Sequence, residues 1–158
     1  MLAVYDSGFV LGKGSEAGFW SLLRERTGLR GDDASLHARM IDGFIMRPWL
    51  LDRIKQLREQ GYITGILSDQ TDWLDSLDRA HHFYRHFDVI YNSYYLGKGK
   101  RDPGHFTDIA ADLELPPAAI VFVDDNKQNV DRAVAAGMQG IHYTKRENFE
   151  HSLQLALS

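Results

Sequence analysis

The chain has 158 residues, enough for one compact domain with a substantial core but hardly for two. Its net charge of −4, without a long basic run, argues against nucleic acid or an acidic membrane as the main partner. The sequence contains no cysteine, which excludes disulfides, thiolate chemistry and cysteine-ligated metals. No run approaches the ~18 apolar residues of a membrane span, and the N-terminus lacks the pattern of a signal peptide. We therefore expect a cytoplasmic protein.

Five short apolar runs predict β-strands, at residues 2–5, 62–67, 88–91, 119–123 and 139–143. They are nearly continuous rather than alternating, which is typical of strands buried on both faces of a parallel sheet. Helical patterns separate the later runs, at residues 48–60, 102–113 and 126–136. Alternating strands and helices of this kind predict an α/β fold with a doubly wound parallel sheet.

Residues 12–47 break this alternation. They hold two helical patterns, one through Phe19 and Trp20 and another through Leu36 and Met40, with no strand between them. We interpret residues 12–47 as a helical insertion into a core formed by residues 1–11 and 48–158. An insertion that follows the first strand would lie over the site as a short cap.

Polar residues follow four of the predicted strands. In such sheets ligands bind beyond the carboxyl ends of the strands, so these positions are the candidate site. The residues are Asp6, Ser68-Asp69, Asn92-Ser93 and Asp124-Asp125.

Asp124 and Asp125 are the strongest of these signals. Two adjacent carboxylates at a strand end repel each other unless a cation neutralises them. Their hard oxygen atoms suit Mg²⁺, which keeps several waters and binds phosphate oxygens in its remaining positions. The alternative is that they only cap the helix that follows.

Two further residues suit phosphate binding. The hydroxyl of Ser68 can bind a phosphate oxygen beside the N-terminus of the helix that begins near Thr71, although Ser68-Asp69 is also a common N-cap pattern. Lys100 lies in the loop after the third strand, where an ammonium could neutralise phosphate and steady a carboxylate. The alternative for Lys100 is an ordinary solvated lysine.

The order of these motifs resembles a known family. A strand that ends in Ser68, a Lys-x-Asp-Pro loop from Lys100 to Pro103, and an apolar strand that ends in Asp124-Asp125 with Asn129 behind it are similar to motifs two, three and four of the haloacid dehalogenase-like hydrolases. The resemblance covers residues 48–143. Arg101 stands where many relatives have proline.

The resemblance extends to motif one over residues 4–10 and makes Asp6 the nucleophile. It implies that the Asp6 carboxylate attacks phosphorus and that water hydrolyses the resulting aspartyl-phosphate. It also implies that Mg²⁺ is held by Asp6, the carbonyl of Gly8, Asp124 and Asp125. Many phosphatases have an aspartate acid/base where this chain has Gly8. Ser68, Asp69 and Lys100 would bind the phosphate group, with Asn129 in support.

Three functions stay open. The first is a Mg²⁺-dependent phosphatase that acts on a small phosphorylated metabolite. The second is a haloacid dehalogenase, in which Asp6 would attack carbon, although the Asp124-Asp125 pair would repel a carboxylate substrate. The third is a degenerate or N-terminally truncated, non-catalytic protein that acts in binding, because residues 5–8 followed by Phe19 and Trp20 also resemble a turn and helix inside the cap of relatives. A shortened cap would expose apolar surface around Phe19 and Trp20, which offers a homodimer interface.

Overall fold

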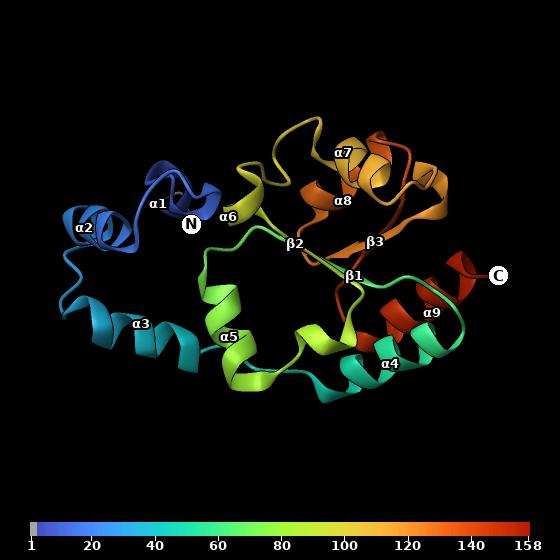
Figure 1. Ribbon diagram of the computed structural model, residues 1–158, viewed down its shortest axis with the longest axis horizontal. Coiled ribbons are helices and arrows are strands. Elements are labelled where there is room, and N and C mark those ends of the chain that lie inside the picture. Colours follow the sequence, from blue (N-terminus) through green and yellow to red (C-terminus); the bar gives the residue numbers. More distant parts are fainter. Residues whose placement is uncertain (1–2) are drawn as a thin grey trace. The chain divides into compact units, whose positions relative to one another are not determined.

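The computed structural model describes residues 3–158, and the chain divides into two compact units, Met1–Gly99 and Lys100–Ser158 (Figure 1). The first unit contains α1 (Ala3–Asp6), the 3₁₀ helix η1 (Phe9–Leu11), α2 (Glu16–Thr27), α3 (Asp33–Asp42), α4 (Pro48–Glu59), β1 (Gly65–Ser68), α5 (Trp73–His81), η2 (Tyr84–His86), β2 (Val89–Asn92) and α6 (Ser93–Leu96). The second contains α7 (His105–Asp112), η3 (Pro117–Ala119), β3 (Val121–Asp124), α8 (Lys127–Ala135), β4 (Gln139–His142) and α9 (Arg146–Ala156).

In the first unit, β1 and β2 form a parallel pair connected through α5. Their register places Ser68 opposite Asn92, so the polar ends of both strands lie side by side. The opposite end of the pair is fixed by Asp88, whose carboxylate accepts a 2.8 Å hydrogen bond from the backbone N–H of Thr64 and two from Arg58. These bonds fix the amino ends of β1 and β2, which are the ends opposite Ser68 and Asn92.

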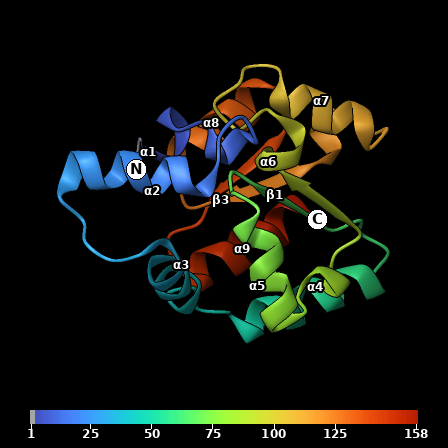
Figure 2. The same cartoon turned by 60° about the vertical axis from the view of Figure 1, so that its left-hand side comes forward.

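An aromatic cluster forms the core of the first unit and joins its N-terminal helices to α5. Trp20 of α2 stacks on Trp73 of α5 with ring centroids 5.4 Å apart, and Phe9 of η1 meets the edge of Trp73 at 5.7 Å. Such pairs add to the stabilisation from burial alone. Helix α3 also packs against α5 (Figure 2). Phe19 and Trp20 are 8% and 2% exposed, so neither of them contributes to the exposed apolar surface predicted around them, and the homodimer stays a prediction.

In the second unit, β3 and β4 form a parallel pair connected through α8, with Asp124 opposite His142. The core includes Phe106 of α7 and Phe122 of β3, whose ring centroids are 5.0 Å apart at a near-perpendicular angle. Helix α8 begins after Asn126, whose side chain accepts a 3.0 Å hydrogen bond from the N–H of Gln128. An N-cap of this kind satisfies one of the donors left unpaired at the start of a helix.

Four of the five predicted strands are confirmed as β1 to β4, with β1 limited to Gly65–Ser68. The predicted helices are confirmed as α2, α3, α4, α7 and α8, although α7 begins at His105 and residues 102–104 form a turn. The strand predicted at residues 2–5 is wrong over the described positions. Residues 3–6 form helix α1, which continues into η1 through a left-handed Gly8.

The fold class is confirmed in part. The molecule is a mixed α/β structure with parallel strands joined by helices, but its described strands form two pairs, β1–β2 and β3–β4, rather than one doubly wound sheet. The predicted insertion at residues 12–47 does hold α2 and α3, whereas its separation from a core of residues 1–11 and 48–158 stays a prediction. Among the described residues, no helix is both long and apolar enough to cross a membrane.

Candidate functional site

Lys100 and Asp124 form a largely buried ion pair in the second unit. The Nζ atom of Lys100 lies 2.6 Å from Oδ2 of Asp124, and the two side chains are only 12% and 6% exposed. The same ammonium lies 5.7 Å from the ring centroid of Phe122, at a distance typical of a cation–π interaction. The structure thus brings together two of the predicted site residues, one on the loop before α7 and the other at the end of β3.

Two further donors hold the Asp124 carboxylate. The backbone N–H of Asn126 donates to Oδ1 at 2.7 Å, and the side-chain amide of Asn129 lies 3.3 Å from both oxygens. Burial raises the pKa of Asp124, but the hydrogen bond and charge of Lys100, together with these donors, outweigh burial and hold that pKa below its ordinary value of 3.8. Asp124 is therefore an anion at neutral pH, and the supporting role of Asn129 in a functional site stays a prediction.

Asp125 extends this centre toward solvent. Its side chain is exposed, while its backbone carbonyl accepts a 3.0 Å hydrogen bond from Nε2 of His142 on β4. Within residues 3–158, no three His, Cys, Asp or Glu side chains group closely enough to hold a metal ion. Mg²⁺ is commonly held by one or two carboxylates plus waters and phosphate oxygens, so the donors of Asp124 and Asp125 fit that ion by their chemistry.

Ser68 and Asp69 lie in the first unit, where β1 ends. Ser68 is half-buried, and Asp69 accepts a hydrogen bond from the hydroxyl of Tyr5 on α1. Gly99 packs against the same carboxylate, because a Cβ atom at that position would lie 3.0 Å from Oδ1 of Asp69. Asp69 is therefore held between the N-terminal helix and the loop that leads to Lys100.

Asp6 and Gly8 do not occupy the end of a strand. Asp6 is exposed on α1 and forms an ion pair with Arg26 of α2. The carbonyl of Gly8 already accepts backbone hydrogen bonds from Leu11 at 3.1 Å and from Lys13 at 3.0 Å. A carbonyl oxygen has two lone pairs, so both are in use. The roles of Asp6 as nucleophile and of Asp6 and Gly8 as metal ligands stay predictions, without the strand on which they were based.

Asn92 and Ser93 gained no role from the sequence, yet both are buried beside the loop that follows Ser68. Asn92 donates a 3.0 Å hydrogen bond from its side chain to the carbonyl of Thr71. Ser93 lies within hydrogen-bonding distance of the carbonyls of Val10 and Gln70. The sequence pattern could have identified Asn92 and Ser93, because these two polar residues follow a predicted strand, as Ser68 and Asp124 do.

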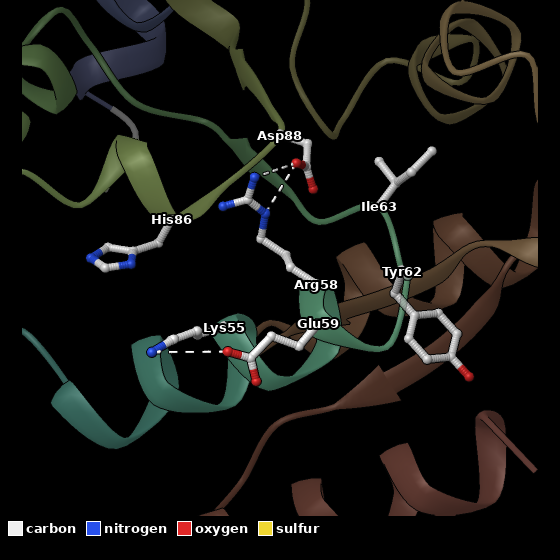
Figure 3. Close-up of a pocket in the computed structure, with 8 residues that line it drawn as sticks. Lys55, Arg58, Glu59, Tyr62, Ile63, His86 and Asp88 are labelled. Carbon is white, nitrogen blue, oxygen red and sulfur yellow. Dashed lines mark hydrogen bonds and ion pairs between the residues drawn. The ribbon is translucent and has the colours of Figure 1, made fainter.

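A groove in the first unit lies at the amino ends of β1 and β2, away from Ser68 (Figure 3). Arg58 points toward Asp88, and Lys55 of α4 points toward Glu59, so the charged groups along its wall face one another. Tyr62 and Ile63 add partly exposed apolar surface. None of the predicted site residues lines this groove, and its Arg58–Asp88 ion pair joins α4 to the residue that precedes β2.

A family model described as haloacid dehalogenase-like hydrolase matches residues 12–137, a range that contains Ser68, Lys100 and Asp124 but not residues 1–11. The chain is also similar to an enolase-phosphatase of Aquifex aeolicus, with 29% identity over 64% of this chain and 46% of that protein. A sesquiterpene phosphatase of Aspergillus oryzae is 27% identical over 77% of this chain and 63% of its own length. The chain thus spans about half the length of these two relatives.

Solved structures share the fold. A haloacid dehalogenase family enzyme from Bacteroides thetaiotaomicron superposes with a TM-score of 0.80 at 22% identity, over 96% of this chain and 79% of that chain. An alanine variant of the same enzyme, crystallised with magnesium and inorganic phosphate, has a TM-score of 0.78 at 23% identity, over 92% of this chain and 75% of that one. A family hydrolase from Porphyromonas gingivalis gives 0.79 at 23% identity, over 98% and 78%.

Proposed function

The chain belongs to the haloacid dehalogenase-like hydrolase family, and we propose that it is a magnesium-dependent phosphatase that acts on a small phosphorylated metabolite. The observation that carries this proposal is the buried Lys100–Asp124 pair at the end of β3. A buried charge costs several kcal/mol to desolvate unless it is well paired, so a fold retains such a pair most readily where it serves a purpose. The similarity to two phosphatases supports the same reaction.

Each residue of the proposed site has a distinct part in binding the phosphate ester. The hydroxyl of Ser68 would donate to one phosphoryl oxygen, and the ammonium of Lys100 would neutralise another. Asp124 and Asp125 would hold Mg²⁺, and that ion would supply the charge that reduces repulsion between the phosphoryl group and a carboxylate. Asn129 keeps the Asp124 carboxylate oriented through its 3.3 Å contacts.

Asp6 is the candidate nucleophile in this scheme. One of its oxygens would form a bond to phosphorus while the bond from phosphorus to the ester oxygen breaks, and the leaving oxygen would take a proton from water, because Gly8 offers no acid. Water would then attack phosphorus and release inorganic phosphate and the free carboxylate. For this chemistry, Asp6 must leave its ion pair with Arg26, because a carboxylate paired with a guanidinium is a weaker nucleophile.

A second candidate function is the binding of a phosphorylated ligand without turnover. The position of Asp6 favours it, since this residue lies on a helix rather than at the end of a strand, and the family match begins after it. In that case Ser68, Lys100 and Asp124 would bind phosphate and Mg²⁺, while no carboxylate would attack phosphorus.

Hydrolysis of p-nitrophenyl phosphate by the full chain, with and without MgCl₂, separates these candidates. The phosphatase proposal expects Mg²⁺-dependent turnover that falls by about 10²-fold or more in Asp124→Asn and in Lys100→Met. The matched control is Asp131→Asn, because Asp131 is an exposed carboxylate of α8 paired with Lys127, and this variant should keep the wild-type rate. Turnover that is also lost in Asp6→Asn would identify the nucleophile.

The other outcomes are equally decisive. Turnover that survives Asp6→Asn removes Asp6 from the mechanism. No turnover, but Mg²⁺-dependent binding of inorganic phosphate that is lost in Asp124→Asn, would replace the phosphatase with the binding protein. A chain that neither hydrolyses the ester nor binds phosphate would contradict both candidates.

A further inference from the structure

Ser93 occupies a junction between three segments of the first unit. It follows directly after β2, begins α6 and is 0% exposed. Its neighbour Asn92 lies opposite Ser68 in the register of the two strands. The residue therefore sits beside the end of β1 that the proposed function assigns to phosphate binding.

The hydroxyl of Ser93 has two acceptors within reach. Its Oγ lies 2.7 Å from the carbonyl oxygen of Val10 and 3.3 Å from that of Gln70. A serine hydroxyl carries one proton, so it donates fully to only one of these carbonyls at a time. The shorter distance makes Val10 the main acceptor in this structure, and any movement of Gln70 toward Ser93 competes with that bond.

The loop after Ser68 is held elsewhere by bonds that do not involve Ser93. The carbonyl of Thr71 accepts a 3.0 Å hydrogen bond from the side chain of Asn92, and the hydroxyl of Thr71 accepts one from the N–H of Trp73 at 3.2 Å. Thr71 is 0% exposed. Because the loop is fixed at Thr71, the contact between Ser93 and the segment next to Ser68 is made through the carbonyl of Gln70.

The other acceptor belongs to a rigidly docked segment. Phe9 and Val10 of η1 are each 1% exposed, and the ring of Phe9 meets that of Tyr94 on α6 edge-on at 5.9 Å. Gly12 has a φ of +64°, and a Cβ atom there would lie 2.3 Å from the carbonyl oxygen of Tyr94. There is little free space around η1, so its neighbours cannot relax to compensate for a change in the Ser93 hydrogen bond. Such a change therefore alters the stability of η1 itself.

We infer that Ser93 is a positioning residue that couples η1 to the loop following Ser68, so that phosphate bound at Ser68 changes the stability of η1. This coupling rests on the proposed phosphate site for its ligand, but the link through Ser93 is a property of the ligand-free chain. The 3₁₀ helix η1 thereby responds to occupation of the site without contacting the phosphate itself.

Hydrogen exchange of the ligand-free chain tests the link directly. Removing the hydroxyl in Ser93→Ala leaves the carbonyls of Val10 and Gln70 without this donor, so we expect about fivefold to tenfold faster exchange in both residues 9–12 and residues 70–74. Ser93→Cys keeps the size with a weaker donor and should give an intermediate rate. The control is Ser35→Ala, because Ser35 is exposed and its hydroxyl donates to the carboxylate of Asp32, outside both segments. Faster exchange in one segment alone, or in neither, would overturn the link.

Addition of inorganic phosphate with MgCl₂ tests the coupling. In the wild-type chain we expect slower exchange in residues 68–74 and a changed rate in residues 9–12, whereas Ser93→Ala should respond only in residues 68–74. An equal response of residues 9–12 in both proteins, or none in the wild type despite protection at residue 68, would overturn the inference. If phosphate protects neither segment, the proposed phosphate site fails, and the ligand-free comparison alone decides whether Ser93 links the two segments. Should Ser93→Ala not fold, Ser93→Cys takes its place in both comparisons.

Discussion

Two aspartates predicted as ligands of one metal ion have very different environments. Asp124 ends a strand, is largely buried and receives hydrogen bonds from Lys100, Asn126 and Asn129. Asp6 is exposed on a short helix and forms an ion pair with Arg26. The orientation of Asp124 is therefore fixed by the fold, whereas Asp6 is held by an exposed ion pair.

This difference shows which kind of sequence evidence carries structural information. The role of Asp124 was predicted from an apolar strand, a loop with Lys100 before it and an asparagine five residues after it. These three features must occur in a fixed order and spacing, so each one supports the assignment of the others. The role of Asp6 came from the resemblance of residues 4–10 to motif one. That resemblance requires a strand before Asp6, and a run of four apolar residues is compatible with a helix or a strand. A carboxylate becomes a credible metal ligand when independent elements converge on it.

The largest expected effect contrasts the two ion pairs. Lys100→Met leaves Asp124 buried without its counter-charge and should lower the free energy of unfolding by about 3 kcal/mol. Arg26→Met removes the partner of Asp6 in an ion pair whose two side chains are more than 40% exposed. This variant should change the free energy of unfolding by less than about 1 kcal/mol. Urea denaturation of both variants measures the contrast. Equal losses would mean that the two aspartates are held alike.

A second contrast concerns glycines of the N-terminal segment. Gly12 and Gly28 both have positive φ angles, but a Cβ atom at Gly12 would lie 2.3 Å from the carbonyl oxygen of Tyr94, while one at Gly28 meets nothing within 4 Å. Gly28→Ala should cost about 1 kcal/mol from backbone strain alone. Gly12→Ala should cost clearly more, because η1 must move away from α6. Thermal melts that show similar costs would contradict the tight docking of η1.

A smaller effect follows from the depressed pKa of Asp124. A folded-state pKa below the unfolded value of 3.8 contributes stability that is present above pH 3.8 and is lost as the pH falls through the folded pKa. The stability difference between the wild type and Asp124→Asn should therefore shrink between pH 6 and pH 3. Urea midpoints at both pH values provide the test, and a difference that grows on acidification would contradict the assigned direction.

The sequence predicted the second half of the chain well. The strands at 119–123 and 139–143, the helix between them and the proximity of Lys100 to Asp124 all follow from an apolar run bounded by polar motifs. These features are local, or they follow from the rule that parallel strands bring their carboxyl ends to one edge. Residue spacing was sufficient to locate them.

The N-terminal part was harder to predict because tertiary contacts decide its structure. Helix α1 is only four residues long, and its docking depends on Tyr5 reaching Asp69 and on the aromatic cluster around Phe9 and Trp73. No pattern within residues 2–10 encodes those partners. The helical spacing of Phe19 and Trp20 suits packing but does not identify their partner, since Trp73 covers them from a distant part of the sequence.

The most direct test of the central claim is a crystal structure of the full chain grown with Mg²⁺ and orthovanadate. We predict Mg²⁺ on the carboxylates of Asp124 and Asp125, with the Lys100 ammonium on an oxygen of the vanadate. A structure in which vanadate and Mg²⁺ bind elsewhere, and Lys100 and Asp124 stay paired only with each other, would contradict the claim that this centre is the phosphate site.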